Sequence, residues 1–120
     1  MKVILSLGSN VHQDSNIGKA RKMLECLFHD IRFSDSIWTQ PIGLDSDLFL
    51  NCLAVAHTDK PLETIRKEMK RIEMELGDSS HIHGVVNIDV DILQYGDYRY
   101  KHSDWQRDYV KSLMCQLEKT

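Results

Sequence analysis

The sequence predicts an α+β fold in which two helices cover one face of an antiparallel sheet. Two segments carry apolar residues at helical spacing, short apolar or alternating runs flank them, and the resulting order is strand, helix, strand, strand, helix, strand. A length of 120 residues is about one domain's worth of chain, so we expect a single domain over residues 1–120. The 42% hydrophobic and 28% charged content is ordinary for a globular protein.

The first half of the chain supplies a strand, a helix and a second strand. Val3–Leu7 is a short apolar run that ends at Gly8, typical of a buried strand feeding an ordinary turn before a helix. Between Ser15 and Phe28 the apolar residues recur every three or four positions, which predicts one buried helix face. Arg32–Thr39 is expected to form a more polar strand.

The second half repeats the pattern. The expected elements are a loop over Gln40–Asp47, a strand over Phe49–His57, a helix from Pro61 to Gly77 and an alternating strand over Val85–Tyr95. The remainder is expected to be a loop to about residue 104 and helical afterwards. This order is the split βαβ arrangement of a ferredoxin-like sandwich, whose second sheet face is left for a ligand or for additional structure.

Charge and composition exclude several classes of partner. The net charge of −3 gives no basic field for non-specific binding to nucleic acid. No run approaches the ~20 apolar residues of a membrane span, and the apolar N-terminal run is too short for a signal peptide. Three scattered cysteines indicate reduced thiols. We therefore expect a cytoplasmic protein, a monomer or weak dimer, that binds small molecules rather than nucleic acid or membranes.

The strongest local signal is Asp89 and Asp91 in the last predicted strand. Because side chains alternate along a strand, both carboxylates should share one face, about 7 Å apart along the chain. Val90 and Ile92 should point the other way, toward the helices. Mg²⁺ ions bridging the phosphates of a nucleotide would relieve the repulsion between the two carboxylates. The alternative is an ordinary solvated sheet face, on which alternation readily produces this spacing.

Phe49 and Asn51 form a second candidate pair on another strand face. An aromatic ring beside an amide offers a stacking surface and a hydrogen-bonding edge to a flat heterocycle. Taken alone, the pair is also explained by an aromatic core residue next to a strand-edge asparagine.

Several segments in fixed order resemble one enzyme family, the 6-hydroxymethyl-7,8-dihydropterin pyrophosphokinases. The matching segments are Leu7-Gly8-Ser9-Asn10, Asn16-Ile17, Trp38-Thr39-Gln40-Pro41-Ile42-Gly43, Phe49-Leu50-Asn51, Ile72-Glu73 with Leu76-Gly77, and Asn87-Ile88-Asp89-Val90-Asp91-Ile92-Leu93. The resemblance covers about residues 1–95 and implies transfer of pyrophosphate from ATP to 6-hydroxymethyl-7,8-dihydropterin in folate biosynthesis.

The resemblance also implies roles for individual residues. Two Mg²⁺ ions would be held by Asp89 and Asp91, which together with Arg107 form the implied catalytic set. The implied pterin-binding residues are Thr39, Pro41, Ile42, Phe49, Asn51 and Tyr109. The implied nucleotide-binding residues are Lys70, Glu73, Ile92, His102 and Arg107.

Two positions depart from the pattern of the family. Asp78 and Val86 stand where family members usually carry arginines, and such charges stabilise phosphoryl-type transfer. A second hypothesis is therefore a weakened homologue that binds pterin or nucleotide without efficient turnover. Val86→Arg is expected to recover part of the rate, unless Val86 faces the helices, where the new charge would be buried.

Overall fold

The structure, a computed structural model, describes residues 1–40, 48–77 and 85–118. Its centre is a six-stranded antiparallel sheet ordered β2-β4-β1-β5-β6, in which β3 also pairs with β4. The strands are β1 (Lys2–Ser9), β2 (Asp30–Phe33), β3 (Ile37–Thr39), β4 (Phe49–His57), β5 (Asp89–Tyr95) and β6 (Tyr98–Arg99). This order confirms the predicted ferredoxin-like α+β sandwich.

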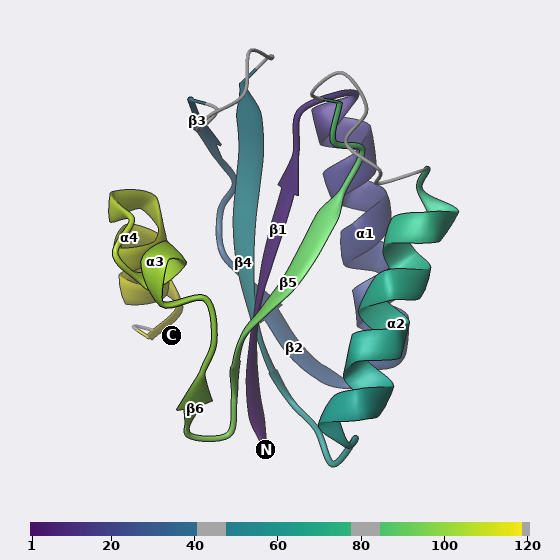
Figure 1. Ribbon diagram of the computed structural model, residues 1–120, viewed down its shortest axis with the longest axis vertical. Helices are drawn as coiled ribbons and strands as arrows, with labels where there is room; N and C mark the ends of the chain where they lie inside the picture. Colours follow the sequence, from purple (N-terminus) through teal and green to yellow (C-terminus); the bar gives the residue numbers. More distant parts are fainter. Residues whose placement is uncertain (41–47, 78–84, 119–120) are drawn as a thin grey trace.

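Helices cover the sheet from both sides (Figure 1). The helices are α1 (Gln13–Leu27), α2 (Leu62–Glu75), α3 (His102–Trp105) and α4 (Asp108–Glu118). The first two pack on one face, as predicted, and the last two lie on the opposite face. The C-terminal segment is therefore the additional structure that occupies part of the second face.

Side chains alternate between the two faces of β1, so this strand contributes residues to both hydrophobic cores. Val3, Leu5 and Leu7 belong to the core beneath α1 and α2, whereas Ile4 belongs to the core beneath α4. Because both faces are covered over this stretch, the strand reads as a continuous apolar run rather than an alternating one.

The strand expected over Arg32–Thr39 is wrong in one respect, because it is broken into β2 and β3. Both pair with β4, but Phe33 lies opposite Ala54 and Ile37 opposite Asn51, so one extra residue is accommodated between them. Ser34 borders this bulge and stays opposite Leu53: its backbone N–H donates to the Leu53 carbonyl, and its Oγ accepts from the Leu53 N–H. A bulge leaves no signal in hydrophobic periodicity.

The elements after residue 84 also differ from expectation. The strand expected from Val85 begins only at Asp89, and the expected loop from Gly96 contains β6 and α3. Gly96, with φ of 61°, supplies the left-handed turn that joins β5 to β6. Among the described helices, none has the length and apolar character needed to cross a membrane.

Candidate active site

Asp89 and Asp91 lie on the sheet face that carries α3 and α4. Their neighbours Val90 and Ile92 are buried in the core beneath α1 and α2, as strand alternation predicts. Both aspartates are partly exposed, and across β1 they face Gly8 and Ser6 respectively. The shared face of the two carboxylates is therefore confirmed.

A row of residues crosses four strands at the level of Asp89. Its members, in order from β3 to β5, are Ile37, Asn51, Gly8 and Asp89. Gly8 has no side chain, and a Cβ there would lie 3.2 Å from Asn51 Oδ1. The interpretation of Gly8 as part of an ordinary turn is wrong, because it lies within β1 and keeps the sheet surface open between Asn51 and Asp89.

A small cavity of about 190 Å³ stands over this row. It is lined by Ser6, Gly8, Thr39, Gln40, Phe49, Asn51, Asp89, Asp91, Asp104, Arg107 and Tyr109. Four residues expected to bind the pterin are thus brought together with the aspartates and Arg107. Asn51 is 6% exposed and its Nδ2 donates to Thr39 Oγ1 at 2.7 Å, which fixes the amide at the cavity wall.

The C-terminal helices place charge at the rim of the small cavity. Arg107, between α3 and α4, lies 3.5 Å from Asp104 Oδ1. Burial raises the pKa of Tyr109, opposed by the charge of Arg107 and by hydrogen bonding with Arg107 and Ser6. Tyr109 is therefore a neutral ring with a polar end, suited to stacking and hydrogen bonding rather than to removing a proton.

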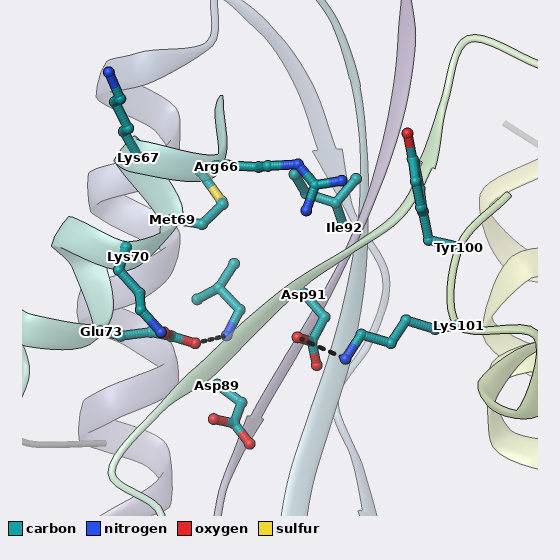
Figure 2. A pocket seen from close by; sticks show the side chains of 11 residues that line it. Arg66, Lys67, Met69, Lys70, Glu73, Asp89, Asp91, Ile92, Tyr100 and Lys101 are labelled. Atoms are coloured by element: carbon teal, nitrogen blue, oxygen red, sulfur yellow. Dashed lines mark hydrogen bonds and ion pairs between the residues drawn. The ribbon is translucent and has the colours of Figure 1, made fainter. Parts of the chain in front are cut away.

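A larger cavity of about 720 Å³ lies between β5 and α2. Figure 2 shows α2 on one side, the β5 carboxylates at the floor, and Tyr100 and Lys101 on the far side. It is lined by Arg66, Lys67, Met69, Lys70, Glu73, Asp89, Val90, Asp91, Ile92, Tyr100 and Lys101. Since Asp89 and Asp91 line both cavities, they stand where the two meet.

Comparison with known proteins gives two matches. The profile of the 7,8-dihydro-6-hydroxymethylpterin-pyrophosphokinase family matches residues 4–119. The chain belongs to this family. It is also 34% identical over 107 residues, 82% of its length, to the folate synthesis bifunctional protein of Chlamydia muridarum (strain MoPn / Nigg). The matched region is 24% of that relative, so the chain spans about a quarter of the length of the bifunctional protein.

Within this pyrophosphokinase family member, Glu73 joins α2 to β5, the strand that carries Asp89 and Asp91. The Val90 N–H donates to Glu73 Oε2 at 2.9 Å, and Lys70 Nζ lies 3.8 Å from Oε1. Glu73 is 8% exposed, and burial raises its pKa, opposed by the hydrogen bond from Val90. Its carboxylate therefore holds the backbone between the two aspartates in place.

The role of Glu73 in stability can be tested by two substitutions. Glu73→Ala is expected to lower the free energy of unfolding by about 1–3 kcal/mol, because the buried Val90 N–H loses its acceptor. Glu73→Gln keeps an acceptor and removes the buried charge, so a change of less than about 1 kcal/mol is expected. Denaturant unfolding measures both, with exposed Glu75→Ala as control. Equal losses in the alanine and glutamine variants would contradict the acceptor role.

The pH dependence of stability follows from the raised pKa of Glu73. The folded state holds this proton more tightly than the unfolded state, in which the pKa is near 4.5. The free energy of unfolding should therefore fall as the pH rises from 4.5 through the higher pKa of the folded state. The Gln variant should lose this component, which melting curves across that interval would show.

Some predicted site residues do not line the two cavities, and some lining residues were not predicted. His102 is exposed at the start of α3 and is not among the lining residues of the two cavities. Pro41 and Ile42 lie outside the described residues, as does Asp78. Arg66 was missed, although its spacing from Lys70 and Glu73 places all three on one face of a helix. Tyr100 was missed as a site residue because a short hairpin, which leaves no signal in the sequence pattern, brings it to the cavity.

Proposed function

We propose that this chain transfers pyrophosphate from ATP to 6-hydroxymethyl-7,8-dihydropterin, in the cytoplasm and as part of folate biosynthesis. The observation that carries the proposal is the position of Asp89 and Asp91 at the junction of two unlike cavities. One is walled by cations from α2, and the other by an amide and aromatic rings. A nucleotide triphosphate and a flat heterocycle need these two environments, and their reacting atoms must meet between them.

The larger cavity suits the nucleotide. Arg66, Lys67 and Lys70 on α2 line it, and their charges favour a triphosphate. Ile92 supplies apolar surface at its floor. We assign His102 and Arg107 to the phosphates as well, although Arg107 approaches from the rim of the smaller cavity.

The smaller cavity suits the pterin. Phe49 and Tyr109 offer ring surfaces for stacking, and the amide of Asn51 offers a hydrogen-bonding edge. Thr39 stands beside Asn51, and we assign Pro41 and Ile42 to the same contact on the strength of the family motif alone. The cavity thus favours a planar ring with polar edges over a flexible chain.

The carboxylate pair fits Mg²⁺. Two carboxylates on one face provide hard oxygen ligands but only part of an octahedral set, and phosphate oxygens and water would supply the rest. We propose that Asp89 and Asp91 hold two such ions. The chemistry that bound Mg²⁺ supplies is neutralisation of phosphate charge and polarisation of the β-phosphoryl group.

The proposed reaction is a direct displacement at the β-phosphorus of ATP. A bond forms between the pterin hydroxymethyl oxygen and this phosphorus, and the bond from the β-phosphorus to the oxygen bridging it to the α-phosphorus breaks. AMP leaves with that oxygen, and the hydroxyl proton passes to water. The residues of this chain contribute mainly by orienting the two substrates and by stabilising charge, with Arg107 placed to pair with phosphate oxygens.

A coupled assay of AMP release tests the proposal. Purified protein with Mg²⁺, ATP and the dihydropterin should form AMP only when the dihydropterin is present. The alternative is a homologue that binds without efficient turnover, and it is motivated by Val86 and Asp78, which stand where the resemblance to the family implies arginines. Binding of both ligands without AMP release would support that alternative, and binding of neither would contradict both.

Asn51→Ala is expected to weaken pterin binding. Removing the amide leaves polar groups of the ligand unpaired, at a cost of about 1–3 kcal/mol, or about 5- to 150-fold in the dissociation constant. Calorimetric titration with 6-hydroxymethylpterin measures the loss. The control is Gln116→Ala, which removes an exposed amide on α4, away from both cavities. Unchanged affinity in the Asn51 variant would place the pterin elsewhere.

A further inference from the structure

Lys101 has a backbone conformation that lysine rarely adopts. Its φ of 57° and ψ of 56° lie in the left-handed region, directly before α3. The surroundings hold it there: the Lys101 carbonyl accepts from the Asp104 N–H at 2.9 Å, and the Trp105 indole donates to the Tyr100 carbonyl at 3.0 Å. A strained residue fixed by its neighbours often serves the site that it faces.

The side chain of Lys101 reaches the carboxylate pair from the side opposite α2. Its Nζ lies 3.7 Å from Asp91 Oδ1, and Figure 2 shows the chain extended toward that carboxylate. The two side chains are 53% and 39% exposed, so the pair is accessible to water and can separate. An ion pair this exposed contributes at most about 1 kcal/mol to stability.

Two other basic residues near this hairpin approach partners other than Asp89 and Asp91. The guanidinium of Arg99 lies 4.0 Å from the centroid of the Trp105 ring, and that of Arg107 pairs with Asp104. At position 86, where the resemblance to the family implies an arginine, this chain has a valine that is 1% exposed. Lys101 is therefore well placed to supply charge beside the aspartates from the side opposite α2.

We propose that Lys101 is a phosphate-binding residue. Its ammonium group pairs with Asp91 in the absence of metal, and a metal ion that binds to this carboxylate would displace it. An ammonium and a divalent cation compete for the same carboxylate oxygen. Once the metal is bound, the ammonium is repelled from it, and its three donors become available to phosphate oxygens at the mouth of the same cavity. The inference rests on the proposed function and adds one nucleotide contact to it.

Lys101→Asn should change the affinities for metal and for nucleotide in opposite directions. The substitution removes the charge, and asparagine tolerates the left-handed backbone. Mn²⁺ alone should bind about 3-fold more tightly than to wild type, because the competing cation is gone. The non-transferable analogue α,β-methylene-ATP, with saturating Mg²⁺, should bind about 10-fold more weakly, because a charged phosphate contact is lost. Calorimetry measures both constants.

Two further variants complete the experiment. Lys101→Arg keeps the charge and should restore most of the analogue affinity. Lys111→Asn, an exposed lysine on α4, removes the same net charge away from the cavities and should change neither constant. Melting curves identify any variant that fails to fold; if Lys101→Asn does, Lys101→Gly, which also removes the charge and tolerates the left-handed backbone, carries the comparison.

The outcomes separate this inference from the proposed function. Unchanged constants in Lys101→Asn, or two constants that shift in the same direction, would overturn the role of Lys101 while leaving the proposed function intact. Failure of the wild-type protein to bind the analogue with Mg²⁺ would overturn the proposed function itself. A purely structural role for Lys101 would lower the melting temperature without producing effects of opposite sign.

Discussion

Asp91→Asn is expected to reduce AMP release at least about a thousandfold, equivalent to about 4 kcal/mol of barrier. The substitution removes one of the two charges proposed to hold Mg²⁺ at the junction of the cavities. The fold should persist, because the side chain is partly exposed and its ion pair with Lys101 contributes little to stability. Initial rates at saturating ATP and a melting curve, measured side by side, give both quantities.

Asp89→Asn is expected to behave in the same way. Asp97→Asn is the matched control, because it neutralises an exposed carboxylate in the turn that joins β5 to β6. Excess Mg²⁺ should not restore either site variant, since the missing charge belongs to the protein. A site variant that retained a wild-type rate would contradict the metal role, and one that unfolded would contradict a role confined to the site.

Val86→Arg is expected to destabilise the protein by about 3 kcal/mol or more, because it places a charge in a position that is 1% exposed. The backbone of Val86 is also fixed on both sides: its N–H donates to Asn10 Oδ1, and its carbonyl accepts from the Asn10 N–H at 3.0 Å. We therefore no longer expect an arginine at position 86 to recover part of the rate. We expect the alternative, in which the new charge is buried and the protein loses stability.

The neighbouring residue provides the control for this prediction. Val85 is 43% exposed, so Val85→Arg adds the same charge one position away and should change the free energy of unfolding by less than about 0.5 kcal/mol. Denaturant unfolding compares the two. A stable Val86→Arg variant with a raised rate would show that the arginine reaches the phosphates after all.

The fold was largely predictable because its helices and long strands have clear hydrophobic periodicity in the sequence. The apolar stripe of α2 and the alternation of β5 depend on residues close together in the chain, so periodicity is enough to find them. The bulge at Ser34 and the turn at Gly96 depend instead on partners in other strands or on a single backbone angle. Such features have no period, and they account for the break in the strand expected over Arg32–Thr39 and for the missed strand β6.

The candidate site was predictable where it lies on regular strands. Asp89, Asp91 and Asn51 share a face because of strand alternation, and the structure places them together as expected. Lys101 could not be assigned in this way, since the approach of its side chain to Asp91 depends on the hairpin that contains β6 and on the left-handed backbone of Lys101 itself. The space that Gly8 leaves between Asn51 and Asp89 was not predicted either, because a glycine at the end of an apolar run is also typical of a turn.

Asn10 and Val86 are joined by two hydrogen bonds. The segment entering β5 is tied to β1 by this contact, and Gly77 packs so closely on Asn87 that a side chain at position 77 would collide with it. Residues 78–84 thus connect two anchored ends. Changes in the length of that connection should therefore leave the register of the two aspartates unchanged.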